Sequence, residues 1–341
     1  MKKLSFMNKI IYFINIVAAL VLLFSFVLPF LPPKTFAVLS VLNLGVSFLI
    51  ILNILFALYW LIRLKRQFVL SALILFLGYF LFGSLYKFSA SKHVESESNF
   101  KVMNYNVRLF NLYDWIKDDN IQTNIVDFIK TEAPEILCVQ EYHPHKNIDL
   151  SFFKYKFEKL SGKTIKYGQA IFSQFPIINS GSIEFPNTGN NAIFADVVKD
   201  TDTIRIYNIH LESLHINADV ESLKNEDSER LLKRVGSTFK MQQFQTELFL
   251  MHKKQCKHKM IVCGDFNNTA FSFVYRKVKG DLQDTFKEGG NGFGRTYDFK
   301  FFPVRIDFIF ADEIFNVNGF KSFDAHYSDH FPIMTTLALE N

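Results

Sequence analysis

Long apolar stretches and short alternating ones divide the chain into two parts. Three uncharged stretches come first, at Ile10–Leu31, Phe36–Ile62 and Phe68–Tyr86. Their polar residues are scattered Asn, Ser and Tyr, without the polar face that a buried helix of a soluble protein normally keeps. Crossing a bilayer core takes roughly 20 helical residues. The pattern therefore predicts three transmembrane helices that bind the chain to a lipid bilayer.

After these stretches the pattern changes to short apolar runs that alternate with amphipathic ones. Residues 87–99 are rich in Ser, Lys, Glu and His, which indicates a linker between a membrane anchor at 1–86 and a soluble domain at 100–341. We expect two helices in this domain, at Ile121–Lys130 and within Ser228–Lys253. The expected strands are Phe100–Val107, Ile136–Gln140, Gln169–Phe172, Ala192–Val198, Ile204–His210, Met260–Cys263, Arg305–Phe310 and Ile333–Ala338.

Basic residues beside the apolar stretches indicate the orientation in the membrane. Six lie before the first stretch or between the second and third, against Lys34 alone between the first and second. The six are Lys2, Lys3, Lys9, Arg63, Lys65 and Arg66. The first stretch is longer than the ~7 to 15 residues of a signal peptide and has no small-x-small cleavage pattern, which favours a retained anchor. We expect an integral membrane protein, of the inner membrane if the host is a bacterium, with its soluble domain outside the cytoplasm.

Charge is distributed unevenly along the chain. Residues 1–99 contain nine Lys and Arg and two Glu, a balance of +7, whereas residues 100–341 contain 29 Lys and Arg and 31 Asp and Glu, a balance of −2. The net charge of +5 therefore reflects the flanks of the apolar stretches. A tight nucleic-acid binder normally carries strong positive charge, so this balance disfavours a nuclease without excluding one.

Polar side chains suited to metal and phosphate chemistry follow the ends of apolar strands. Asn106 and Glu141 each close one, and amide and carboxylate oxygens suit Mg²⁺. Asp265 and Asn267 follow the strand Met260–Cys263, where they are placed to meet one phosphate and its attacking water. Each of these alone also fits a plain surface residue or an Asx turn that ends a strand.

Two histidines and a buried carboxylate extend this set. His210 ends a strand and His330 follows Asp329, and two imidazoles can divide the proton transfers of phosphodiester hydrolysis. Asp307 lies on an apolar strand, where an unpaired carboxylate is costly, so we expect a histidine partner for it. No carboxylate partner for His210 is evident in the sequence.

In their order and spacing these fragments resemble the endonuclease/exonuclease/phosphatase superfamily, the DNase I-like fold, over about residues 100–339. The fragments are Tyr105-Asn106-Val107, Val139-Gln140-Glu141, Ile209-His210-Leu211, Gly264 to Asn267, Arg305 to Phe308 and Ser328-Asp329-His330. The resemblance implies a four-layer α/β sandwich with two central mixed sheets and the site at one end.

The resemblance also implies a role for each site residue. Asn106 and Glu141 would lie near a Mg²⁺ ion, with Mn²⁺ as a possible substitute, and Asp329 would support the metal or a water. Asp265 and Asn267 would contact phosphate and water. His210 would act as acid or phosphate contact, and His330 as base or oxyanion stabiliser oriented by Asp307. Arg108 departs from the pattern, because many nuclease members carry an acidic residue there.

Together these observations predict a membrane-anchored, Mg²⁺-dependent phosphoesterase that hydrolyses a phosphodiester with an activated water. A lipid or another envelope phosphoester is the expected substrate, because the anchor keeps the domain close to lipid headgroups. Two alternatives stay open at this point. One is an endonuclease or exonuclease acting on DNA or RNA, and the other is a catalytically silent module that binds a phosphorylated ligand.

Overall fold

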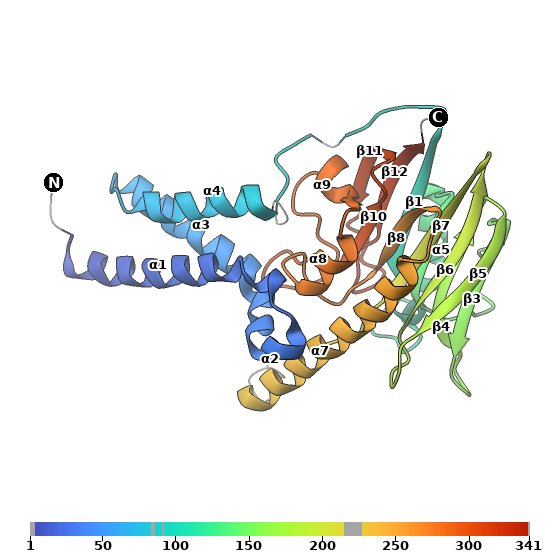
Figure 1. Cartoon of the computed structure of the whole chain (residues 1–341), viewed down its shortest axis with the longest axis horizontal. Coiled ribbons are helices and arrows are strands. Elements are labelled where there is room, and N and C mark those ends of the chain that lie inside the picture. The colour runs from blue at the N-terminus through green and yellow to red at the C-terminus, as the bar shows by residue number, and fades with distance from the viewer. Residues whose placement is uncertain (1–3, 83–85, 91, 215–226, 340–341) are drawn as a thin grey trace.

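Two six-stranded sheets are the centre of the domain that follows residue 98 (Figure 1). The computed structural model describes residues 4–82, 86–90, 92–214 and 227–339. The first sheet contains, in spatial order, β11 (Phe315–Ser322), β12 (Ile333–Leu339), β1 (Asn99–Asn106), β2 (Ile136–Tyr142), β4 (Tyr167–Ser173) and β3 (Tyr155–Ser161). The second contains β5 (Ile177–Glu184), β6 (Asn191–Lys199), β7 (Asp202–His210), β8 (Lys259–Asp265), β10 (Asp307–Ala311) and β9 (Gln283–Asp284). Both are mixed, because β1 pairs parallel with β2 and β7 with β8, among antiparallel neighbours.

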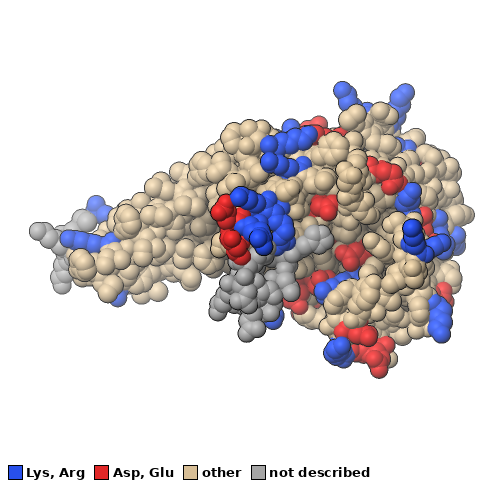
Figure 2. Space-filling view, turned by 90° about the horizontal axis from the view of Figure 1, so that it is seen from below, with Lys and Arg blue, Asp and Glu red and all other residues tan. Residues whose placement is uncertain are grey.

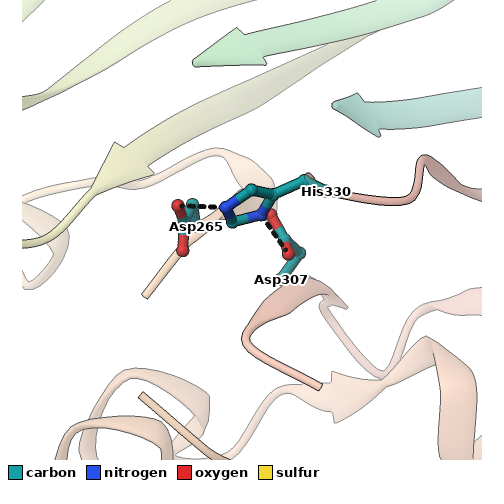
Figure 3. Close-up of side chains that lie close together, drawn as sticks. All are labelled: Asp265, Asp307 and His330. Atoms are coloured by element: carbon teal, nitrogen blue, oxygen red, sulfur yellow. Dashed lines mark hydrogen bonds and ion pairs between the residues drawn. The ribbon is translucent and has the colours of Figure 1, made fainter. Parts of the chain in front are cut away.

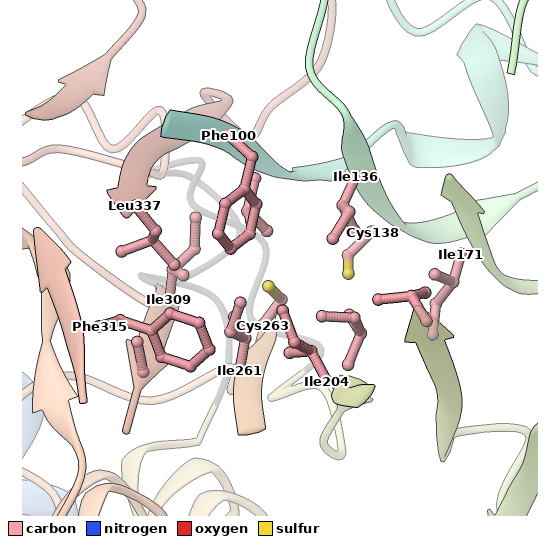
Figure 4. Packing of buried hydrophobic residues seen from close by; sticks show 14 of the residues in the cluster. Phe100, Ile136, Cys138, Ile171, Ile204, Ile261, Cys263, Ile309, Phe315 and Leu337 are labelled. Carbon is pink, nitrogen blue, oxygen red and sulfur yellow. The ribbon is translucent and has the colours of Figure 1, made fainter. Parts of the chain in front are cut away.

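Strand alternation explains how the sheets pack into layers. In β1, Phe100 and Val102 face the core between the sheets, whereas Met103 and Tyr105 face outwards. Figure 4 shows the inner core, where Cys138 and Cys263 lie as small buried residues. Helix α5 (Ile121–Glu132) covers the outer face of the first sheet. Helices α7 (Ser228–Lys253), α8 (Phe273–Lys279) and α9 (Thr285–Gly289) pack on the second sheet or at its edge, so the predicted four-layer sandwich is confirmed.

The sequence pattern missed the strands at the sheet edges. β3, β5, β9 and β11 are the four outermost strands, and none of them was expected. An edge strand faces a neighbour on one side only and tolerates polar residues, as in Tyr155–Ser161, so its apolar alternation is weak. The eight expected strands are present with shifted ends; β10, for example, begins at Asp307 rather than Arg305.

The N-terminal part folds into apolar helices that project from the sheets (Figure 1). They are α1 (Phe6–Ser25), η1 (Leu28–Phe30), α2 (Pro33–Val41), η2 (Leu42–Gly45), α3 (Val46–Ile62) and α4 (Phe68–Phe82). Among the described residues, two helical segments are long and apolar enough to cross a membrane, Phe6–Phe30 and Pro33–Ile62. The expectation of three such helices is therefore corrected to two. α4 has 15 residues, about 22 Å at 1.5 Å per residue, and residues 83–85 of the expected third span lie outside the described part.

A buried polar network joins α4 to α1 and α3. Asn15 Nδ2 donates to Ser71 Oγ at 2.6 Å, and Trp60 Nε1 donates to Asn15 Oδ1 at 3.0 Å. Ser71 Oγ in turn donates to Asn53 Oδ1 at 3.0 Å. Polar contacts of this kind hold helices together where the surroundings are apolar. The helical bundle (α1, α3 and α4) is thus one packed unit, and Figure 2 shows it almost free of charged side chains, with basic residues at its far end.

Helix α2 joins this bundle to the two-sheet domain by packing on α7 (Figure 1). The Lys34 backbone N–H donates to Gln243 Oε1 at 2.8 Å, and the Lys34 ammonium pairs with Glu247. Gly236 lets the two helices approach, since a Cβ there would lie 3.3 Å from Ala37 Cβ. The segment expected as a linker also lies on the domain, where the Val94 N–H donates to Asn318 O at 2.9 Å.

A buried ion pair supports the strand that delivers Asp307. The Arg305 guanidinium donates to both carboxylate oxygens of Asp284, at 3.1 and 2.8 Å, and the two side chains are 5% and 1% exposed. Tyr275 adds a hydrogen bond of 2.7 Å to Asp284. Burial opposes ionisation of this carboxyl, but Arg305 outweighs it and holds the pKa of Asp284 below its ordinary value.

We expect Arg305→Leu to lower the free energy of unfolding by about 3–5 kcal/mol, because it leaves a buried carboxylate without its partner. The exposed Lys277→Leu, on α8, is the control and should change it by less than about 0.5 kcal/mol. Labelling of the buried thiols Cys138 and Cys263 during urea titration, in a Cys256→Ser background, measures unfolding. Equal midpoints for the two variants would contradict the assignment.

Candidate active site

One rung across three neighbouring strands brings together three of the predicted site residues. β7 pairs His210 with Asp265 of β8, and β8 pairs Asp265 with Asp307 of β10. Gly264 makes the close pairing possible: its φ is +154°, and a Cβ there would lie 2.1 Å from Ile209 O. The second sheet therefore delivers an imidazole and two carboxylates side by side at one end of the sandwich.

The first sheet delivers Asn106 and Glu141 to the same end of the sandwich. Glu141 lies at a bulge of β2 with a φ of +49°, which re-aims its side chain relative to the regular strand. Asn106 Nδ2 donates to Asp265 Oδ2 at 3.0 Å and to Glu141 Oε1 at 3.3 Å. This amide therefore bridges the two sheets at the mouth of the site.

Asp265 and Asp307 lie on opposite sides of the His330 ring (Figure 3). Nδ1 of His330 is 2.9 Å from Asp307 Oδ2, and its Nε2 is 3.6 Å from Asp265 Oδ2. Burial opposes charging of the imidazole, but the two carboxylates outweigh it and raise the pKa of His330 well above its ordinary value. The histidine partner that we predicted for Asp307 is thus His330, and Asp307 fixes the orientation of its ring.

Asp265 is the centre of the cluster. Its Oδ1 accepts the Asn267 N–H at 2.8 Å, and Asn267 Nδ2 donates to Leu211 O at 3.0 Å. Burial raises the pKa of Asp265 to about 6, with the neighbouring histidines acting in the opposite direction. Asp265 and Asn267 thus form one hydrogen-bonded turn. It fits both interpretations made from the sequence, an Asx turn that ends a strand and a part of the phosphate site.

His210 faces the same carboxylate from the other side. Its Nε2 is 3.7 Å from Asp265 Oδ2, beyond hydrogen-bond range, and this buried atom has no hydrogen-bond partner among the described residues. Burial lowers the pKa of His210 despite the attraction of Asp265, so the neutral ring is favoured. Asp265 is therefore the carboxylate near His210 that the sequence did not reveal.

Asp329 faces a different neighbour. Its Oδ2 is 3.3 Å from Arg108 Nε, and the Arg108 guanidinium lies over the Trp115 ring at 4.4 Å. Ser328, which precedes Asp329, donates from its hydroxyl to Asn106 O at 2.9 Å and so ties the loop to β1. The role near metal or water that we expected for Asp329 stays a prediction. In this structure the positively charged Arg108 side chain already lies beside its carboxylate.

The cluster offers donors for a hard cation. Among the described residues, ligand atoms of Asp265, Asp307 and His330 lie within 4.8 Å of one another. Because Asp307 and His330 bind each other, Asp265 and the nearby Glu141 are the carboxylates best placed for Mg²⁺. Burial raises the pKa of Glu141, and a cation beside it would offset that cost.

Two contributors were not anticipated from the sequence. Gln242, fully buried on α7, donates from Nε2 to Glu212 O at 2.8 Å and to Asn267 O at 3.2 Å, so it connects the loops after β7 and β8. The Tyr297 ring lies edge-on to His330, with centroids 5.1 Å apart. For Gln242, the available signal in the sequence was the occurrence of three glutamines within residues 242–245 of an expected helix. Tyr297 lies in a loop without a recognisable pattern.

We expect Asp307→Asn to lower the pKa of His330 by about one to three pH units, because an amide no longer stabilises the imidazolium and burial then dominates. Titration of ¹³C-labelled histidine resonances measures the shift. The control is Asp298→Asn, which alters an exposed carboxylate 3.8 Å from His326 and should leave His330 unchanged. An unaltered His330 titration in Asp307→Asn would refute the pairing.

Known structures share this fold at low sequence identity. The endonuclease/exonuclease/phosphatase from Beutenbergia cavernae is 17% identical, with a TM-score of 0.54 and coverage of 72% of this chain and 72% of that one. For the human Nocturnin catalytic domain with bound sulfate the values are 19%, 0.53, 74% and 96%. For the endonuclease/exonuclease/phosphatase from Bacteroides vulgatus they are 18%, 0.54, 72% and 100%. No curated protein sequence matches the chain.

Two family models match separate parts of the chain. One, described as a domain of unknown function, matches residues 8–85 and so covers most of the apolar helices. The other is that of the endonuclease/exonuclease/phosphatase family, a family of hydrolases of phosphoric esters, and it matches residues 103–330. That range contains every site residue described above, from Asn106 to His330. The chain belongs to the endonuclease/exonuclease/phosphatase family.

Proposed function

We propose that this chain is a membrane-anchored, divalent-metal-dependent phosphoesterase that hydrolyses a phosphodiester with an activated water. One observation carries the proposal: the buried Asp265 carboxylate lies between the Nε2 atoms of two histidines, at 3.6 and 3.7 Å. Hydrogen bonds from Asn106 Nδ2 and from the Asn267 N–H hold both of its oxygen atoms in place. Here it faces two proton carriers and adjoins further oxygen donors.

Asp265 and Glu141, with Asn106 between them, would hold the cation. The carboxylate oxygen atoms of Asp265 and Glu141 fit Mg²⁺, or Mn²⁺ in its place, because both ions prefer oxygen ligands. When bound, such an ion polarises a phosphoryl oxygen and neutralises the charge that develops on it. The hydrogen bonds of Asn106 to both carboxylates keep them in position before the ion arrives.

The two histidines would divide the proton transfers. Asp307 holds the His330 ring by Nδ1, so that Nε2 faces the reacting groups and its positive charge stabilises negative charge on the phosphoryl oxygens. His210, whose neutral ring is favoured by burial, has an Nε2 atom without a hydrogen-bond partner among the described residues, and it can contact phosphate or take the proton of the attacking water. The charged His330 can then protonate the leaving oxygen. Asn267 would help to orient the water through the turn that it forms with Asp265.

A phosphoester of the membrane is the substrate class that we favour over nucleic acid. The domain carries slightly more acidic than basic residues, and the face shown in Figure 2 carries both signs in separate small groups rather than one basic stripe. Phosphate backbones are bound chiefly by such stripes. Parallel assays on plasmid DNA and RNA would reveal nuclease activity, and steep salt dependence would favour it.

The catalytic test uses the full-length protein in detergent. We expect it to hydrolyse methyl p-nitrophenyl phosphate, to lose this activity with a chelator and to regain it with Mg²⁺ or Mn²⁺. Asp265→Asn and His330→Asn should each lower kcat by about 10²- to 10⁴-fold while the protein remains folded at the assay temperature. Asp298→Asn, at an exposed position, is the control. Turnover that persists in chelator would refute the metal role, and metal-dependent binding without turnover would favour a silent binding module.

The orientation test uses two exposed positions in a Cys256→Ser background. The basic residues before α1 and between α3 and α4 support a cytoplasmic position for the N-terminus and for that end of the bundle. Because α4, although short, leads from that end back toward the catalytic domain (Figure 1), we infer that the domain lies outside the cytoplasm, in a bacterial host beyond the inner membrane. We expect Asp200→Cys, in the domain, to react with an impermeant maleimide in intact cells. Arg66→Cys, between α3 and α4, should react only after permeabilisation. The reverse result would place the domain in the cytoplasm.

A further inference from the structure

An apolar groove lies where the helical bundle meets the catalytic domain. Its volume is about 460 Å³, within the range of sites that bind small molecules. The bundle lines it with Phe26, directly after α1, with Ile54 of α3 and with Tyr79 of α4, and the domain with Phe271 and Phe293. Apart from two tyrosine hydroxyls, its side chains offer no hydrogen-bonding group, so they suit a hydrocarbon ligand and no polar one.

Close packing and a row of aromatic rings form the walls. A Cβ at Gly78 would lie 2.7 Å from Phe26 Cζ, so the glycine lets the Phe26 ring lie against α4. From α4 the rings continue through Phe88 and Tyr86 to Phe293, with centroids 4.6 Å apart for the first pair and 4.8 Å for the second. Tyrosines favour the boundary between bilayer and water, and this row, which contains Tyr86, joins the bundle to the domain.

The groove adjoins the end of the sandwich that carries the site residues. Phe293 precedes Tyr297, whose ring contacts His330, by four residues, so their Cα atoms lie at most about 14 Å apart at ~3.5 Å per residue. A second cavity of about 10 Å³, room for about one water molecule, is lined by Phe271 and Phe293, which also line the groove, and by Arg305, two residues before Asp307. The separation along the chain places the catalytic histidine within reach of a molecule that has one end in the groove.

We propose that the groove binds one hydrocarbon chain of a membrane lipid whose phosphoric ester is the substrate of the adjoining site. The inference rests on the proposed function and names its substrate class. With the apolar bundle in a bilayer, as the proposed function has it, hydrocarbon surrounds the bundle, and the groove opens between its helices. A helix of a partner or of a second copy is about 10 Å across, so roughly one turn of it would fill this volume. A single lipid chain fits better.

The first arm of the test measures binding without activity. The full-length protein is placed in nanodiscs that contain a phosphatidylethanolamine with a photoreactive diazirine at the end of one chain. We expect labelled peptides to include Phe271 or Phe293 together with α3 and α4. Ile54→Trp, which narrows the groove, should reduce this labelling at least fivefold. Leu55→Trp is the matched control, since the neighbouring Leu55 is 58% exposed, against 41% for Ile54, and lies outside the lining.

The second arm measures the role in turnover with two substrates that share one leaving group. Hexadecyl p-nitrophenyl phosphate carries a long chain, and methyl p-nitrophenyl phosphate carries none. Ile54→Trp should raise KM for the hexadecyl ester at least fivefold and leave kcat/KM for the methyl ester within twofold. Phe293→Ser should act in the same direction, with the exposed Phe301→Ser as its control.

Each failure has its own signature. Labelling that is absent from the groove, or equal in Ile54→Trp and Leu55→Trp, would overturn the chain-binding site. Groove labelling with equal effects on both esters would overturn the substrate assignment and leave a structural lipid. Photoproducts that link two copies through the groove would overturn the lipid in favour of a dimer. Groove labelling without hydrolysis of either ester would refute the proposed function while the binding site stands.

Discussion

The parallel pairing of β7 with β8 is the constraint on which the site depends. This register places His210 opposite Asp265, and the antiparallel pairing with β10 adds Asp307 on the same rung. A slip of one residue would turn each of these side chains to the other face of its strand. Gly264 protects the register, because any side chain at this position would collide with the backbone of β7. The chemistry of the site is therefore fixed by backbone geometry before any side chain contributes.

Hydrogen bonds between buried amides extend this control to the other sheet. Gln140 Nε2 donates to Asn104 Oδ1 at 2.7 Å, and Asn208 Nδ2 donates to Val139 O at 2.9 Å, so strands of both sheets are tied together beneath the site. Buried polar networks of this kind favour one arrangement, because another arrangement would break hydrogen bonds inside the core. Asn106 completes the link at the surface of the site. Two sheets that could otherwise slide over an apolar core are thereby held in one alignment.

The sequence predicted the strands that are buried on both sides and missed those at the edges, since only buried strands need a strong apolar pattern. It also identified the polar residues at strand ends, because such residues are conspicuous after apolar runs. Their partners were harder to find: Asp307 and His330 are distant in sequence, and the pairing of Arg108 with Asp329 depends on a loop of residues with positive φ. Gln242 acts from a helix across a loop, which no local pattern reports. Tyr86, the last residue of the expected third span, lies outside α4, because apolar composition alone does not show where a helix ends.

Helix α7 has one side toward the active-site loops and another toward α2, and this has a consequence for any shortened form of the enzyme. A fragment beginning after residue 99 would uncover Gly236 and Gln243 on one side and Phe271 on another, surfaces that the N-terminal helices cover in the whole chain. Water would then meet side chains selected for contact with protein. Engineering an independent soluble enzyme from this chain thus requires a redesigned exterior, not merely a cut.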